Sequence, residues 1–125
     1  MDPRRGRTSG HTGQQLPLDA LVALLGNTRR RFVLRYLQLR DAPVPIEELT
    51  EAVARWECDD LDEITSHLIE CIRASLHHVH LPKLDDAGLV RYDPAAEWAW
   101  IPENADFNRL DSFLPRDLRV PAEID

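Results

Sequence analysis

One long periodic segment limits the fold of this chain more than any other feature. Its apolar residues recur at intervals of four, four, four and three, as on one face of an α-helix: Ile64, Leu68, Ile72, Leu76 and Val79. This spacing predicts a helix from about residue 62 to Gly88, because glycine suits the position that follows a helix end. Pro82 cannot donate a hydrogen bond to the carbonyl of His78, so we expect a kink or break near 78–81.

The hydrophobic pattern changes after Gly88. Two short segments, 89–92 and 98–101, are rich in aromatic and β-branched residues and are separated by the turn-like residues 93–97. Such a pair of segments predicts a β-hairpin.

Three shorter helices are expected before the long one. Residues 18–25 carry apolar side chains at helical spacing, and Asn27 is a suitable cap for a second helix over about 28–40. The apolar face of that second helix is formed by Phe32, Val33, Tyr36 and Leu37, and its opposite face by Arg29, Arg30, Arg31 and Arg35.

A third helix is predicted to start with Pro45, whose missing N–H costs nothing at a first helical position. Leu49, Val53 and Trp56 form its apolar stripe. We expect Trp56, Leu76 and Leu84 to be buried together between this helix and the long one.

The order of these elements indicates a fold class that is mainly α with a small β-hairpin wing, a winged helix-turn-helix. The domain would span 17–114, between a disordered arm over 1–16 and a tail over 115–125. A last helix is expected after Asn104, with Phe107, Leu110 and Leu114 on one face.

The charge of the chain points to a salty environment. The net charge is −7 and the only lysine is Lys83, so the surface is rich in carboxylates and poor in ammonium groups. Hydrated carboxylates keep a protein soluble in concentrated salt, which also screens their repulsion. We therefore infer a halophilic source, the alternative being an ordinary acidic protein. The acidity argues against a nonspecific coat on nucleic acid, but it does not exclude a local basic patch.

Residues 80–90 (HLPKLDDAGLV) resemble the end of the recognition helix and the start of the wing in ArsR-type winged-helix regulators. Residues 24–31 (LLGNTRRR) with 76–84 (LHHVHLPKL) resemble an uncharacterised winged-helix family of haloarchaea, over about 17–101. The resemblance implies a sequence-specific DNA-binding transcriptional regulator with a recognition helix over about 71–87 and a wing over about 89–101. Two departures are Pro45, where a Ser or Asp cap is usual, and the acidic wing tip.

The residues expected to contact DNA combine hydrogen-bond donors with positive charge: Arg29, Arg30, Arg31, Arg73, Ser75, His77, His78 and Lys83. Arginine can bind the O6 and N7 atoms of guanine, and lysine suits a phosphate. Three arginines at the positive end of a helix are unfavourable unless an anion approaches, either DNA phosphate or an acidic surface. The alternative is that these side chains are simply solvated.

No metal site and no cofactor are predicted. His67 with Cys71, and His77 with His80, could each share a helix face, but neither pair has an evident third ligand. The paired cysteines through which ArsR-type proteins often sense metals are absent, so Cys58 and Cys71 are interpreted as free thiols.

No enzyme motif is present, so neither catalysis nor a small-molecule substrate is expected. The chain has no apolar run long enough for a membrane span and no secretory signal, which predicts a cytoplasmic protein. We expect a homodimer formed through the first and last helices, bound to double-stranded DNA. The alternative is an acidic protein-interaction adaptor on the same fold. A continuous positive strip would favour DNA, and an acidic face with apolar patches would favour the adaptor.

Overall fold

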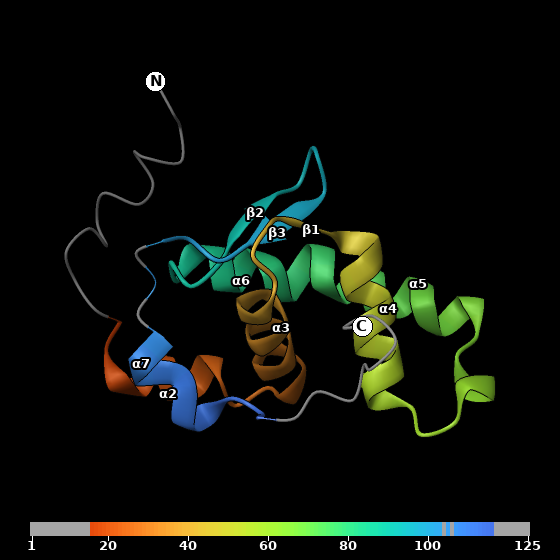
Figure 1. Cartoon of the computed structure of the whole chain (residues 1–125), viewed down its shortest axis with the longest axis horizontal. Coiled ribbons are helices and arrows are strands. Elements are labelled where there is room, and N and C mark those ends of the chain that lie inside the picture. Colours follow the sequence, from red (N-terminus) through yellow and green to blue (C-terminus); the bar gives the residue numbers. More distant parts are fainter. Residues whose placement is uncertain (1–15, 104, 106, 117–125) are drawn as a thin grey trace.

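The computed structural model is mainly helical and carries one small antiparallel sheet, as the sequence predicts (Figure 1). It describes residues 16–103, 105 and 107–116, so most of the predicted arm and tail lies outside the described residues. The N-terminal elements are α2 (Leu18–Leu24), α3 (Thr28–Leu39), β1 (Val44–Pro45) and α4 (Ile46–Glu57). The central ones are η2 (Leu61–Glu63), α5 (Ser66–Ser75), η3 (Leu76–His80) and α6 (Leu81–Asp86). The last are β2 (Arg91–Asp93), β3 (Trp98–Trp100), α7 (Phe107–Leu110) and η4 (Asp111–Phe113).

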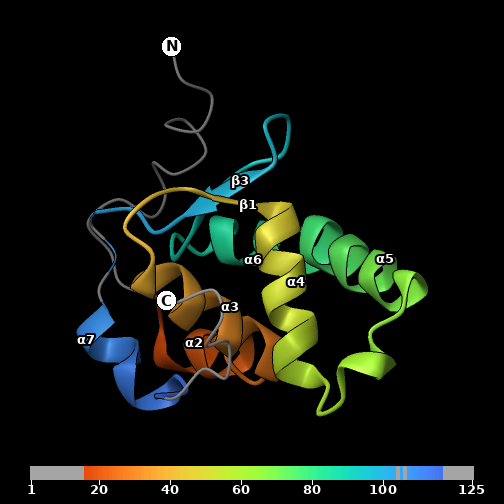
Figure 2. The same ribbon diagram turned by 45° about the vertical axis from the view of Figure 1, so that its right-hand side comes forward.

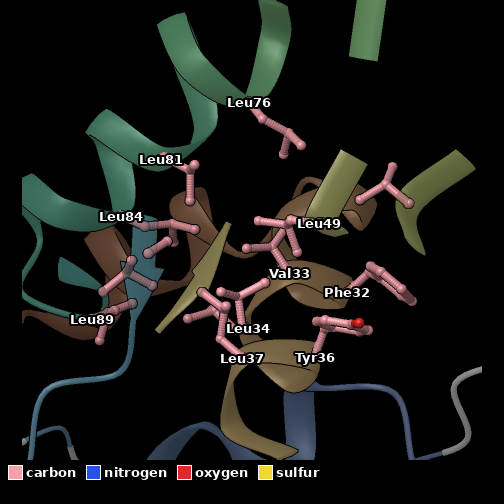
Figure 3. Packing of buried hydrophobic residues seen from close by; sticks show 14 of the residues in the cluster. Phe32, Val33, Leu34, Tyr36, Leu37, Leu49, Leu76, Leu81, Leu84 and Leu89 are labelled. Atoms are coloured by element: carbon pink, nitrogen blue, oxygen red, sulfur yellow. The ribbon is translucent and has the colours of Figure 1, made fainter. Parts of the chain in front are cut away.

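Helix α3 lies at the centre of the core. Asn27 caps it as predicted, its side chain accepting a hydrogen bond from the Arg30 N–H. Figure 3 shows its apolar side chains meeting those of α4 and of the segment after α5. The predicted apolar face is confirmed, because Phe32, Val33 and Leu37 are all buried.

Arg35, predicted on the face of α3 opposite its apolar residues, is buried there and not exposed to solvent. Its side chain is only 8% exposed. The guanidinium donates to the Pro115 carbonyl at 2.8 Å, to Asp111 at 2.8 Å and to Gln38. The C-terminal segment therefore folds over this arginine and satisfies its charge, a contact with no local sequence signal.

Helix α4 starts one residue later than predicted. Pro45 precedes the helix and belongs to β1, with extended backbone angles (φ −63°, ψ 146°). The first helical N–H is that of Ile46, which donates to the carbonyl of Glu97 at 2.9 Å. Pairing of β1 with β3 thus fixes Pro45 in an extended conformation.

The predicted burial of Trp56 is confirmed only in part. Leu76 and Leu84 are fully buried, whereas Trp56 is half-buried at the end of α4. Its ring stacks on Phe32 with 4.6 Å between the ring centroids. The indole thus covers the rim of the core and does not fill its centre.

The long periodic segment is helical but starts at Ser66, not at residue 62. Thr65 caps α5 by accepting the N–H of Leu68 at 3.1 Å, and the separate turn η2 precedes it. We call α5, η3 and α6 together the long helical segment. The cap at Thr65 therefore separates η2 from α5, although hydrophobic spacing alone would join them in one helix.

A π-helical turn, η3, replaces the kink expected near 78–81. The Leu81 N–H donates to the carbonyl of Leu76, five residues back. Pro82, directly after it, has no N–H to offer the preceding turn, which favours this local widening. The extra residue rotates the helix face, so His80 is buried and Val79, predicted on the apolar stripe, is 41% exposed.

The end of α6 confirms the glycine prediction. Gly88 has a φ of +81°. The Leu89 N–H donates to the Leu84 carbonyl and the Gly88 N–H to the Asp85 carbonyl, both at 3.0 Å. This pair of bonds is a Schellman motif, which requires a left-handed residue at the position of Gly88.

Gly88→Ala is expected to lower the free energy of unfolding by about 1–2 kcal/mol, the cost of the left-handed conformation for a residue with a Cβ. The added Cβ meets nothing within 4 Å, so the loss reports backbone strain alone. Gly26→Ala is the control, since Gly26 does not have a positive φ. Urea unfolding measures the free energy of unfolding of both variants. Equal losses would contradict the left-handed conformation of Gly88.

The hairpin is confirmed and gains a third strand. The strand order is β1-β3-β2, and all neighbouring strands are antiparallel. Ala99 of the central strand β3 pairs with Tyr92 of β2 on one side and with Val44 of β1 on the other. The connecting loop covers 94–97 and projects from the body of the molecule (Figures 1 and 2). This arrangement places the loop beside α4 and the long helical segment.

The last helix is short. Leu110 and Leu114 are buried as predicted, while Asn104 and the side chain of Phe107 lie outside the described part of the chain. Helices α2 and α7 lie at one end of the molecule, away from α5 (Figure 2). Among the described residues, no helix has the length and hydropathy needed to cross a bilayer.

Candidate nucleic-acid interface

The outer side of α5 is the most open helical surface next to the hairpin. Its opposite side buries Ile72 and, at the start of η3, Leu76. We call this outer side, together with its continuation onto η3, the open face; its exposed residues are His67, Glu70, Cys71 and Ala74 of α5 and His78 of η3. In both ribbon views α5 lies at the edge of the molecule (Figures 1 and 2). A helix of this kind is free to approach a macromolecule.

Arg73 lies at the side of the open face and is held by two carboxylates. Its Nε atom is 3.1 Å from Glu47 of α4, and its Nη2 atom is 2.7 Å from Glu97 of the hairpin loop. These hydrogen bonds, to Glu97 first and then Glu47, raise the pKa of Arg73. One guanidinium thus joins α5, α4 and the hairpin.

Arg29 and Ser75 bind each other. Arg29 donates to the Ser75 hydroxyl at 2.7 Å and forms a two-point contact with Glu57, both distances being 2.6 Å. The Ser75 hydroxyl also donates to the carbonyl of Ile72 at 3.0 Å. Both side chains are therefore occupied inside the protein, on the joint between α3, α4 and α5.

Arg30 and Arg31 each bind a nearby backbone carbonyl, a pairing that residue type alone does not predict. Arg30 donates to the Leu24 carbonyl at 2.7 Å, and Arg31 donates to the Leu25 carbonyl. Both carbonyls lie at the C-terminal end of α2, where positive charge is favourable. These carbonyls thus offset the unfavourable interaction of the two cations with the positive end of the α3 dipole. Burial lowers the pKa of Arg30.

The remaining predicted contacts differ in exposure. His77 is half-buried, with its Nδ1 atom 2.6 Å from the Tyr92 hydroxyl on β2. His78 is exposed and lies edge-on to His77, with 4.5 Å between ring centroids. Lys83 is exposed on α6. Of the eight predicted residues, only His78 and Lys83 are exposed, and the other six are partly buried.

His80 is a buried titratable group, which the hydrophobic spacing of the sequence does not predict. It is 7% exposed, and its Nδ1 atom lies 3.4 Å from Arg30 Nη1. Burial lowers its pKa to about 4, and the nearby cations Arg30, Arg29 and Lys83 act in the same direction. The π-helical turn, invisible to periodicity, turns this side chain inward.

The arrangement does not produce a continuous positive strip. Arg29 and Arg73 each pair with carboxylates, and Arg30 and Arg31 bind backbone carbonyls. No group of three or more potential metal ligands occurs among the residues described. The site is thus a nearly neutral helix face with hydrogen-bonding side chains, flanked by an acidic hairpin loop.

A family model, described as a domain of unknown function (DUF7344), matches residues 22–99, well over half of the 125-residue chain. The chain belongs to the DUF7344 family. The DUF7344 match contains α3, α4, the long helical segment and the hairpin up to Ala99, and it leaves α7 and η4 outside. The comparisons found no match among curated proteins or solved structures.

Proposed function

We propose that this chain is a sequence-specific DNA-binding regulator with a winged helix-turn-helix fold. The observation that carries the proposal is the open face of α5, an exposed helix flanked by α4 and by a projecting hairpin loop. In helix-turn-helix proteins the second helix of the motif enters the major groove while the first crosses the backbone. By this reading α4 is the first helix, the long helical segment is the recognition helix, and β2–β3 is the wing.

Arg73 is the candidate for base recognition. Its Nε atom contacts Glu47 and its Nη2 atom contacts Glu97, so a base contact through this edge of the guanidinium would exchange those carboxylates for base acceptors. Such an exchange favours the preferred DNA site over others. At the preferred site a bidentate base contact replaces the hydrogen bonds to the carboxylates, whereas at other sites those hydrogen bonds are lost without replacement. Lys83, exposed on α6, is the candidate for a phosphate contact.

Arg73→Ala and Lys83→Ala are expected to affect DNA binding differently. Loss of a base contact should cost about 1–3 kcal/mol on the preferred site and little on random DNA. Loss of a phosphate contact should weaken both and lower the salt slope by about one unit. Fluorescence anisotropy at several KCl concentrations measures these changes. Arg116→Ala, which removes an exposed cation of the C-terminal segment, is the control.

If neither substitution changes the affinity while DNA still binds, the open face is not the DNA-binding surface. Arg29, Arg30 and Arg31 would then be the next residues to replace. Because all three have partners inside the protein, their variants need a parallel measurement of stability.

We further propose a homodimer through α2 and the C-terminal segment. Leu18 and Val22 on α2 are 62% and 50% exposed, and Phe113 on η4 is 38% exposed. These elements lie at the same end of the molecule (Figure 1). Two-fold symmetry would present two recognition helices to two half-sites. Sedimentation equilibrium tests the dimer, and a monomer at all concentrations would contradict it.

An acidic protein-interaction adaptor remains the second candidate. The observation in its favour is that carboxylates neutralise Arg29 and Arg73, so the described residues form no continuous positive strip of the kind expected for DNA binding. Val79 and Trp98, in addition, are 41% and 42% exposed. An adaptor would bind a partner through such apolar side chains and would retain no DNA at any salt concentration.

A further inference from the structure

Two soft metal ligands lie side by side on the open face. His67 and Cys71 are both exposed on α5, one helical turn apart, and the imidazole Nε2 atom is 3.6 Å from the thiol Sγ atom. Zinc bonds of about 2.3 Å to sulfur and about 2.0–2.1 Å to nitrogen, in a tetrahedral arrangement, separate these two atoms by about 3.5–3.6 Å. The pair is therefore spaced as the two ligands of one zinc ion.

We propose that His67 and Cys71 bind zinc together with the same pair from a second copy of this chain. Structural zinc sites take four protein ligands, and the described residues around this pair supply no third one. Two copies related by a two-fold axis supply two thiolates and two imidazoles, which is the Cys₂His₂ set. The ion displaces the thiol protons, so the complete site is electrically neutral.

The surface around the pair allows two helices to approach. Ala74 follows on the same open face and has a small side chain, so it leaves room for a second helix. Glu70 also lies on this face. The two copies of Glu70 would repel each other across the contact, so we expect association through this face to require zinc and to be absent without it.

The second thiol of the chain provides a matched control. Cys58 is half-buried after α4. Burial raises its pKa, as do the carboxylates Glu63, Glu57 and Asp59, so its thiolate form is disfavoured. Among the described residues, no histidine forms a hydrogen bond with its thiol, in contrast to Cys71. If Cys71 forms the site, zinc binding should depend on Cys71 and should not depend on Cys58.

The test is a titration of the reduced, metal-free chain with zinc and with cobalt(II), using absorption, light scattering and circular dichroism. We expect one metal ion for two chains, the visible bands of tetrahedral cobalt with thiolate ligands, and a mass with zinc that is at least twice the mass of the zinc-free species, whether that is a monomer or the proposed dimer. Cys71→Ser and His67→Ala should abolish all three, whereas Cys58→Ser should retain them. Since both positions are exposed, circular dichroism should show that the variants remain folded.

Three results would overturn the site. The first is a cobalt spectrum that survives Cys71→Ser, and the second is one that disappears in Cys58→Ser. The third is one zinc ion for each chain without a change of mass, which would show that the site is not shared with a second copy. A zinc-linked pair covers the open face, so this state and the proposed DNA-bound state exclude each other. None of these measurements involves DNA, so failure of the zinc site leaves the proposed regulator untouched.

Discussion

Leu76→Ala is expected to lower the free energy of unfolding by about 2–5 kcal/mol, the range for a buried leucine reduced to alanine. Leu76 is fully buried where α5 passes into η3, and its side chain points toward the residues of α3 and α4 (Figure 3). The substitution leaves a cavity at the joint of three helices. Urea unfolding followed by circular dichroism measures the loss.

Val79→Ala is the matched control for this experiment. Val79 lies in the same π-helical turn but is 41% exposed, so little packing is lost on its truncation. A loss for Leu76→Ala below about 0.5 kcal/mol, the usual limit for surface changes, would contradict the assigned face of the helix. An equally large loss for Val79→Ala would also contradict it, because Val79 would then have to be packed in the core and not exposed.

Acid is expected to destabilise the fold between pH 6.5 and 4 through His80. Its pKa falls from 6.5 to about 4 on folding, first because of burial and then because of Arg30, Arg29 and Lys83. Between these two pH values the imidazole of the unfolded chain binds a proton and that of the folded chain does not. His80 therefore costs no stability above pH 6.5, and the free energy of unfolding decreases as the pH falls below that value. The shift corresponds to a loss of up to about 3 kcal/mol.

His80→Leu should flatten this pH dependence, because the variant has no proton to bind at that position. His78→Gln, which removes an exposed imidazole from the same turn, should retain the wild-type slope. Unfolding free energies at pH 7, 6, 5 and 4 give the comparison. A wild-type slope in His80→Leu would contradict the burial of this imidazole.

The sequence predicts the elements whose signals are local. Asn27 and Gly88 mark helix ends through their own chemistry, and the change of hydrophobic period marks the hairpin. Each of these predictions is confirmed, because a cap, a left-handed glycine or an alternating strand depends on few distant contacts.

The features that the sequence does not predict depend on distant contacts or on a change of helix type. The burial of Arg35 depends on Asp111 and Pro115, some eighty positions along the chain. The π-helical turn shifts the face of the long helical segment by one residue, so periodicity assigns Val79 to the core in place of His80. Neither effect changes the local hydrophobic pattern.

The candidate site follows the same division. Residue type and helix position correctly place His78 and Lys83 on the surface. Arg29, Arg30, Arg31, Arg73 and Ser75 are engaged by residues or carbonyls of other elements, and such pairing requires the tertiary structure. Charge alone therefore overstates how many cations are available to a nucleic acid.

Selection of genomic fragments by the purified chain in molar KCl tests the regulator proposal most directly. High salt suppresses the contribution of counterion release, so fragments retained there are selected by base contacts and fit. A sequence-specific regulator should enrich a small set of fragments that share a sequence, and Arg73→Ala should lose that enrichment. Recovery of no fragment above the level of a protein-free control, at any salt concentration at which the chain is folded, would contradict DNA binding and favour the adaptor.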